Sequence, residues 1–247
     1  MPTMVENKGA TDISVDWGDG NTEVIAVGAA AVTHEYTEAV QYIAKILPVS
    51  GDVLDGVVLM QGVAEIISWF SGTQPSLQLV GNAVSRVPET PPNGLVNATN
   101  MFKACPYFNQ DISMWDMSNV TNMSSMFFMA TAFNQPLETW NVSNVTDMAD
   151  MFFGATAFNQ PLNGWNVGAV TNMVDMFYSA NAFNQPLNNW DVSKVTSMHS
   201  MFRYNSAFNG DIGNWNVSAV TNMDSMFENT SVFDKPLNGW NVSSVTT

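Results

Sequence analysis

The chain has 247 residues, of which 46% are hydrophobic and only 12% are charged, and its net charge is −15. Seven Lys and Arg residues are too few to line a groove for a phosphate backbone, which argues against a nucleic-acid partner. The surface must therefore be polar mainly through Asn, Thr, Ser and Gln.

Three further features restrict location and chemistry. The single cysteine, Cys105, excludes an intrachain disulfide. No apolar run reaches the roughly 18 residues of a membrane span, so we expect no membrane insertion. The first residues show no charged region followed by an apolar stretch, so no signal peptide is visible in this chain.

Residues 1–50 are predicted to form a small β-rich module. Alternating apolar residues flank Asp19-Gly20, which predicts a hairpin turn where Gly20 supplies a positive φ. Asp16 and Asp19 are candidate calcium ligands, but calcium prefers six or more oxygens, and we interpret both as turn residues. His34 is interpreted as structural. We predict no metal site and no cofactor.

Residues 51–94 are predicted to hold connecting segments and degenerate capping turns. Closing strands are expected first, followed by irregular turns around Leu77–Val80 and Val84–Val87. Pro88, Pro91 and Pro92 interrupt the chain just before the regular array.

Residues 95–247 repeat one 25-residue sequence about six times, with the last copy incomplete. The period is carried by three columns of residues: Trp115, Trp140, Trp165, Trp190, Trp215 and Trp240; Phe108, Phe133, Phe158, Phe183, Phe208 and Phe233; Val120, Val145, Val170, Val195, Val220 and Val245. A period this strict predicts a repeat solenoid.

One repeat, Leu137 to Pro161, predicts the local structure. The spacing Leu137-x-x-Trp140-x-Val142 is that of a leucine-rich-repeat strand with Trp140 and Val142 facing inward. Val145, Met148, Met151 and Phe152 have the three-residue spacing of a helical turn, with Thr146 as N-cap. The expected fold is therefore leucine-rich-repeat-like, with one short parallel strand and one helical turn per repeat.

Other repeated positions are interpreted as structural. The paired methionines, eleven from Met101 to Met226, are spaced with Phe and predict core packing rather than a metal or docking site. Cys105 shares a column with small residues and is expected to be a buried thiol. Asn109, Asn134, Asn159, Asn184 and Asn209 are predicted to form a ladder that satisfies backbone groups at a bend.

The candidate binding residues are those expected to point outward from the strands. They form a small, amide-rich strip, here called the polar strip, of Asp116, Asn141, Asn166, Asn189, Asp191, Asn214 and Asn216. A strip of this kind serves equally as a solvated face or as a binding surface, because solenoids commonly bind through such faces.

The repeat phrases resemble a known family. Phe108 to Phe127 reads FNQDISMWDMSNVTNMSSMF and Phe183 to Phe202 reads FNQPLNNWDVSKVTSMHSMF. Both closely resemble BspA-like leucine-rich-repeat surface proteins. The resemblance covers about Leu95 to Thr247 and implies adhesion at an extracellular, cell or virion surface without catalysis.

The upstream segment is similar to PKD-like β-sandwich modules. The similar residues are Trp17-Gly18-Asp19-Gly20, Thr33-His34-Glu35-Tyr36 and the closing strand Tyr42 to Ile46. Fewer strand residues precede this turn than in a full module, and the last repeat stops halfway. We therefore expect a partial module and a chain cut at both ends.

These features predict a non-enzymatic binding or adhesion module that recognises protein or glycan through the polar strip. The alternative is an architectural particle protein that self-associates through the terminal strand near Trp240.

A polysaccharide-active enzyme is a third possibility, because some solenoids cleave polysaccharides along their flat faces. Such catalysis needs two carboxylates that face each other, which argues against this function here. Asp116 and Asp191 lie three repeats apart, and no other repeat, His or Arg is expected to join Asp147 and Asp150. Ice binding through the threonine column is a lesser possibility.

Overall fold

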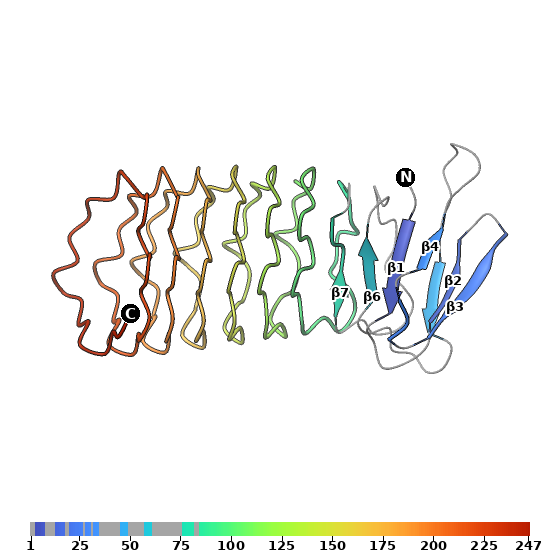
Figure 1. Ribbon diagram of the computed structural model, residues 1–247, viewed down its shortest axis with the longest axis horizontal. Coiled ribbons are helices and arrows are strands. Elements are labelled where there is room, and N and C mark those ends of the chain that lie inside the picture. The colour runs from blue at the N-terminus through green and yellow to red at the C-terminus, as the bar shows by residue number, and fades with distance from the viewer. Residues whose placement is uncertain are drawn as a thin grey trace.

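Figure 1 shows an elongated molecule in which a small β module at one end continues into a stack of coils. This computed structural model describes residues 3–7, 13–17, 20–26, 28–30, 32–34, 45–48, 57–60, 76–81 and 84–247. Gly18, Asp19, Glu35, Tyr36 and residues 42–44 of the predicted PKD-like motifs lie outside the described residues.

The N-terminal module consists of two small sheets. The first has the strand order β4-β1-β6-β7 and the second β3-β2-β5. The strands are β1 (Thr3–Asn7), β2 (Ile13–Asp16), β3 (Thr22–Ile25), β4 (Val32–His34), β5 (Lys45–Pro48), β6 (Val57–Met60) and β7 (Leu77–Gln78). All pairs are antiparallel except β6 with β7, which are parallel.

The predicted hairpin joins β2 to β3. Asp16 pairs with Thr22, the Trp17 N–H donates to the Asn21 carbonyl at 3.0 Å, and Gly20 has a φ of 95°. The positive φ predicted for Gly20 is confirmed. The Trp17 ring is buried and stacks on His34, with 4.8 Å between the ring centroids. Since Trp17 follows β2 and His34 ends β4, this contact ties the two sheets together.

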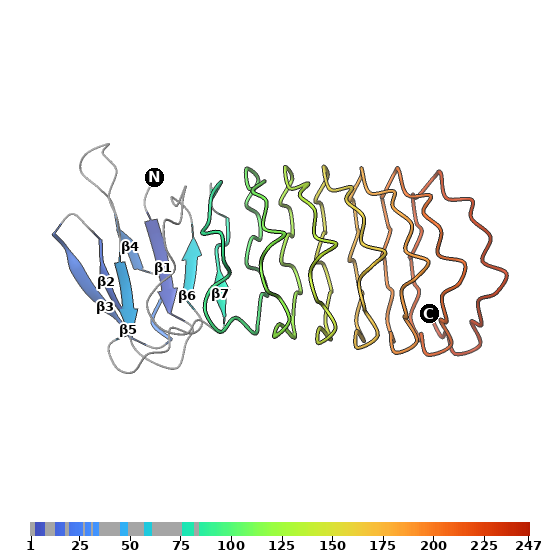
Figure 2. The ribbon, with the colours of Figure 1, turned by 180° about the vertical axis from the view of Figure 1, so that it is seen from behind.

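The module and the array share hydrogen-bonded strands. β6 pairs with β1 on one side and with β7 on the other, so the sheet of the module extends past residue 50. Directly before β7, Ser76 forms a parallel bridge with Asn97 of the first regular coil. Figures 1 and 2 show β6 and β7 adjacent at this junction from both sides. The module thereby covers the first edge of the array, which would otherwise expose unpaired backbone groups.

Each coil is built from β-turns, and the predicted helical turn is wrong. In the coil from Leu137, backbone N–H groups donate to the carbonyl three residues earlier, as in Trp140 to Leu137, Val145 to Val142 and Met151 to Met148. No helix occurs among the described residues. A β-turn brings residues i and i+3 together, so both can face the core, and this spacing imitates a helical face.

The predicted strand position is also wrong. The segment Leu137–Val142 forms no strand, because Leu137 and Trp140 close a β-turn and the Trp140 indole N–H donates to the Ile112 carbonyl at 3.0 Å. Parallel bridges instead join single residues of successive coils, at Asn97, Asn122, Asp147, Asn172, Ser197 and Asn222. Beside them, Thr146 and its equivalents donate their hydroxyls to the threonine carbonyl of the preceding coil rather than capping a helix.

Alternate residues of the long turn segment join neighbouring coils. The N–H groups of Met123, Ser125, Phe127 and Met129 donate to carbonyls 24 residues later, at 2.7–3.0 Å. Two positions per coil have a φ between 52° and 63°, and nearly all are occupied by residues other than glycine: Asn100, Ala104, Ser125, Met129, Asp150, Gly154, Asp175, Ser179, Ser200, Tyr204, Ser225 and Asn229.

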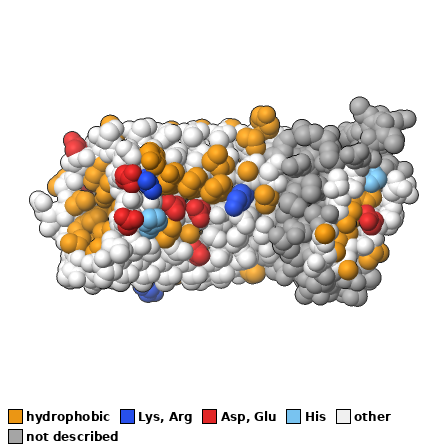
Figure 3. All heavy atoms as spheres, viewed as in Figure 1, with side chains coloured by type: hydrophobic (Ala, Val, Ile, Leu, Met, Phe, Trp, Pro, Cys, Tyr) orange, Lys and Arg blue, Asp and Glu red, His pale blue; other side chains and the backbone are white. Residues whose placement is uncertain are grey.

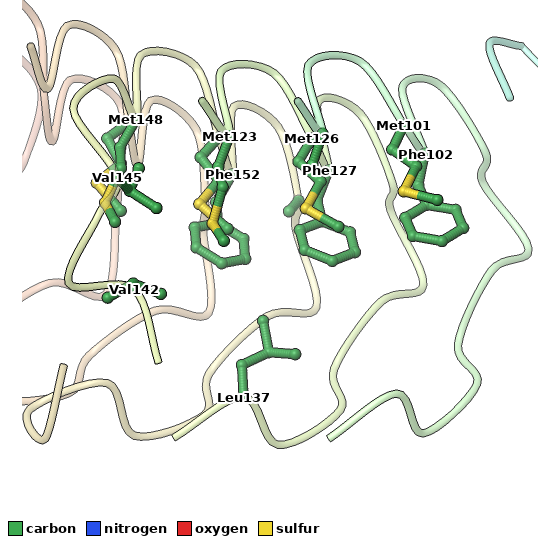
Figure 4. Close-up of a cluster of buried hydrophobic side chains, with 14 of the residues drawn as sticks. Met101, Phe102, Met123, Met126, Phe127, Leu137, Val142, Val145, Met148 and Phe152 are labelled. Atoms are coloured by element: carbon green, nitrogen blue, oxygen red, sulfur yellow. The ribbon is translucent and has the colours of Figure 1, made fainter. Parts of the chain in front are cut away.

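The core consists of like residues stacked above one another. Phe127, Phe152 and Phe177 stack at 5.5–5.6 Å, and Trp165 and Trp190 at 6.4 Å with only 3° between their planes. Figure 4 shows the methionine and phenylalanine side chains pointing into the coils. Five of the six repeat tryptophans are at most 3% exposed, as predicted, whereas Trp240 in the last coil is partly buried.

The asparagine ladder predicted from the sequence is confirmed. Each Asn side-chain carbonyl accepts the backbone N–H of the equivalent residue in the next coil, from Asn109 through Asn209, at 2.7–3.1 Å. Neighbouring Gln side chains also donate to Asn134 and Asn159. The buried Cys105 thiol donates to the Leu79 carbonyl at 2.8 Å, consistent with a structural role.

Removing one rung of the ladder is expected to weaken the stack locally. Asn159→Ala leaves the Asn184 N–H and the Gln185 side chain without this acceptor, and should lower the free energy of unfolding by about 1 kcal/mol. Urea denaturation followed by tryptophan fluorescence measures the loss. Asn181→Ala is the matched control, because the Asn181 side chain is exposed and forms no hydrogen bond within the described residues. Equal stability of the two variants would contradict a structural ladder.

Candidate functional site

All seven residues of the polar strip are exposed, but they lie in turns rather than on a strand. The Oδ1 atoms of Asp116, Asn141, Asn166, Asp191 and Asn216 each accept the backbone N–H two residues later, at 2.9–3.2 Å. Hydrogen bonds from Ser118 and Ser193 also lower the pKa of Asp116 and Asp191. Most of the strip therefore helps to close turns.

The remaining two strip residues, Asn189 and Asn214, have a different environment. Their backbone N–H groups donate to the side chains of Asn163 and Asn188, both at 2.9 Å. Their own side chains are exposed and form no hydrogen bond within the described part of the chain. The prediction that the strip residues point outward from strands is wrong. Five of the seven side chains close turns, and only those of Asn189 and Asn214 form no hydrogen bond among the described residues.

A second outward column carries stacked aromatic rings, and the sequence analysis did not identify it. Phe128 stacks on Phe153 with 4.5 Å between ring centroids, and Phe153 on Tyr178 with 4.4 Å. The Lys103 ammonium lies 4.7 Å from the Phe128 ring centre, and the Arg203 guanidinium lies 6.0 Å from that of Tyr178. These five residues, each 25 apart, are called the aromatic ladder.

Apolar and charged side chains adjoin the aromatic ladder. Met129 and Tyr204 are 43% and 41% exposed, and the Arg203 guanidinium lies 5.1 Å from the Tyr204 ring centre. Together with the ladder they form the surface called the ladder face, whose remaining members are Asp147, Asp150, Asp175, His199, Asp224 and Glu228. Figure 3 shows hydrophobic, acidic and basic side chains gathered on one face of the array.

Two carboxylates on the ladder face have no hydrogen-bonded or ion-paired partner among the described residues. Asp150 and Asp175 occupy the same position in adjacent coils and are partly buried. Burial raises the pKa of both, and the charge of Asp175 raises the pKa of Asp150 further. Lys103 partly offsets the rise at Asp150, and His199 and Arg203 partly offset the rise at Asp175. The expectation that no other repeat joins Asp150 is wrong, because the charge of Asp175 in the next coil acts on it.

The cations near these carboxylates are engaged elsewhere. The Arg203 guanidinium donates to Glu228 at 2.9 Å, and His199 lies 3.5 Å from the Asp224 carboxylate. Asp147 accepts the backbone N–H of Ala149 at 3.0 Å. The ladder face thus holds five carboxylates and two permanent cations, and Asp150 and Asp175 at its centre form no ion pair among the described residues.

Sequence reasoning missed the aromatic ladder because its residues do not repeat. Lys103, Phe128, Phe153, Tyr178 and Arg203 differ in type, so a search for recurring residues passes over them. The available signal was a second ring directly after a core phenylalanine, as in Phe127-Phe128, Phe152-Phe153 and Phe177-Tyr178. A helical interpretation of this segment hid the outward position of that second ring.

The described residues give no geometric basis for a metal centre or a membrane span. No three His, Cys, Asp or Glu side chains among them come together as a ligand set. They also contain no helix of the length and apolarity needed to cross a bilayer.

Residues 96–203 and 163–247 match the family described as Mycoplasma protein of unknown function, DUF285. The two matches together cover more than half of the chain. The chain belongs to this family. Membership agrees with the BspA-like resemblance of the repeat phrases that begin at Phe108 and Phe183. Residues 1–95 lie outside the match, so the PKD-like resemblance remains a prediction. No curated protein and no solved structure matches the chain.

Neutralising Asp150 and Asp175 is expected to stabilise the fold at neutral pH. A raised folded-state pKa means that the charged form is disfavoured by folding, so the wild type loses stability as pH rises above the ordinary Asp value of 3.8. The Asp150→Asn, Asp175→Asn variant should melt higher at pH 7, by about 2–4 °C per kcal/mol relieved. This gain should shrink as pH falls toward 3.8.

The Asp116→Asn, Asp191→Asn variant is the control, and its stability is expected to change with pH in the opposite direction. The lowered pKa of these two groups means that their ionised forms support folding above pH 3.8. Thermal melts from pH 3.5 to 8 compare the two variants. A pH-independent gain for the first variant would indicate only that Asn suits the positive φ of these positions, and would contradict the electrostatic explanation.

Proposed function

We propose that this chain is a non-enzymatic binding or adhesion module, a repeat solenoid displayed on a cell surface or virion. Its N-terminal module, interpreted as PKD-like, acts as the spacer. We place recognition of the protein or glycan partner on the ladder face rather than on the polar strip. The aromatic ladder carries this assignment, because its rings are only half-buried and stand at a position where other coils hold Lys, Arg or Glu.

The coil accepts very different residues at the ladder position. Lys103, Arg203 and Glu228 occupy it in coils with the same turn hydrogen bonds as those holding Phe128 or Phe153. The backbone therefore does not require an aromatic residue at this position. Exposed aromatic and arginine residues are the types enriched in binding hot spots, whereas the small amides of the polar strip are not.

The charge arrangement supports binding without catalysis. A polysaccharide hydrolase needs two carboxylates with different roles, one held protonated and one ionised. Burial raises the pKa of both Asp150 and Asp175. Neither carboxylate therefore has the lowered pKa that would keep it ionised as the nucleophile or base beside a protonated acid.

A second candidate function, subunit assembly, is favoured by the last coil. Phe227, Phe233, Leu237 and Trp240 are only partly buried there, and Val242 is 51% exposed. A second copy or a further coil would cover these side chains equally well. Sedimentation of the full chain at increasing concentration tests self-association, and a protein that remains monomeric would contradict assembly through Trp240.

The ladder-face assignment is tested with glycan and peptide arrays probed with the full chain. Phe153→Ser, Tyr178→Ser should weaken any hit about 30-fold, since losing central aromatic anchors costs about 2 kcal/mol. Asn189→Glu, Asn214→Glu is the matched strip variant, because neither side chain forms a hydrogen bond among the described residues. Thermal melts check that both variants remain folded. If array binding is lost only in the Asn189→Glu, Asn214→Glu variant, the binding site is the polar strip rather than the ladder face.

A further inference from the structure

We propose that the partner of the ladder face is a basic polypeptide segment in which Arg or Lys residues alternate with apolar ones. This proposal rests on the function proposed above and specifies its ligand. It is carried by the position of two carboxylates that form no ion pair among the described residues, each in the same turn as a half-buried stacked ring.

The carboxylates and the rings are held together by the backbone. Asp150 and Phe153 begin and end one β-turn, in which the Phe153 N–H donates to the Asp150 carbonyl at 3.0 Å. Asp175 and Tyr178 form the same turn in the next coil, also at 3.0 Å. The Asp150 N–H joins the two coils by donating to the Val174 carbonyl at 2.8 Å. An acid and a ring therefore recur as a pair in two adjacent coils.

Charge on the ladder face is distributed unevenly. Both permanent cations stand at the ends of the aromatic ladder, where Lys103 covers Phe128 and Arg203 bonds to Glu228. The centre, around Phe153 and Tyr178, holds Asp150 and Asp175 with no ion-pair partner among the described residues. A cation from a partner would complement this centre and relieve the repulsion between the two carboxylates.

The shape of the centre suits long basic side chains. Lys and Arg can lay their methylene stems on an apolar surface while the charged end reaches a carboxylate. The edges of Phe153 and Tyr178 supply the apolar surface, and Asp150 and Asp175 supply the acceptors. A guanidinium can form paired hydrogen bonds with one carboxylate, which would be stronger than bonds between neutral groups. Exposed Met129 and Tyr204 extend the apolar surface for the intervening residues.

Stacking within the ladder argues against ligands that need an open ring face. Phe128, Phe153 and Tyr178 cover one another at 4.4–4.5 Å, and cations lie over both terminal rings. A nucleobase binds by stacking on an exposed aromatic face, and the phosphates of a nucleic acid would also meet the carboxylates of Asp150 and Asp175. A sugar that stacks flat on a ring meets the same obstacle. Ring edges and carboxylates remain available, and both suit a basic, partly apolar peptide.

The test uses three 12-residue peptides with the repeats Arg-Leu-Gly, Glu-Leu-Gly and Arg-Ser-Gly, titrated against the full chain by fluorescence anisotropy. We expect the Arg-Leu-Gly peptide to bind most tightly. Asp150→Asn, Asp175→Asn should weaken it about tenfold. Asp116→Asn, Asp191→Asn removes the same total charge away from the ladder face and should change the affinity less than about twofold. Phe153→Ser, Tyr178→Ser should reduce Arg-Leu-Gly binding to the Arg-Ser-Gly level.

Three results would overturn the basic-peptide proposal: no Arg-Leu-Gly binding, equal Glu-Leu-Gly binding, or equal losses in the two aspartate variants. If the Arg-Leu-Gly peptide does not bind but a glycan or peptide on the arrays binds and loses affinity in the Phe153→Ser, Tyr178→Ser variant, the ladder face binds a partner of other chemistry. If array binding is unchanged in that variant, the proposed function of the ladder face is itself overturned. The two failures are therefore distinguishable.

Discussion

The hydrogen bonds between coils determine the rest of this structure. Alternate N–H groups of each long turn segment donate to carbonyls 24 residues later, while the intervening N–H groups close local turns. From Met123 to Ala130, every backbone N–H thus has a partner without a helix or a continuous strand, as buried polar groups require. An insertion or deletion within a coil would shift the donors against their acceptors, which accounts for the strict 25-residue period.

The same backbone pattern separates positions that serve the fold from positions free to vary. Turn-end residues such as Met148 and Met151 face the core, and Asx side chains such as Asn141 close turns. Residues between turn ends point outward, and position 128 and its equivalents hold a basic, aromatic or acidic residue without altering the coil. Chemistry specific to this chain is therefore concentrated where its repeat is least regular.

The sequence predicted which residues are buried better than it predicted local structure. Met148 and Met151 are three residues apart, so they lie on the same side of the chain both in a helix and at the two ends of a β-turn. Their burial was therefore predicted correctly although the helical turn was not. The polar strip was predicted as a surface, but the use of Asn141 or Asp116 in closing turns depends on backbone geometry that residue type does not reveal. The aromatic ladder was missed because Phe153 and Tyr178 are recognisable only once the turns set their direction.

Stacking in register has a consequence for how such a module reaches its target. The ring planes of Trp165, Trp190 and Trp215 differ by only 2–3° between neighbours, and the asparagine and threonine side chains repeat the same contact from coil to coil. One further coil would lengthen the array by about 4.8 Å and continue each surface column by one residue. The length of the module can therefore vary in whole coils while the contacts between coils stay the same.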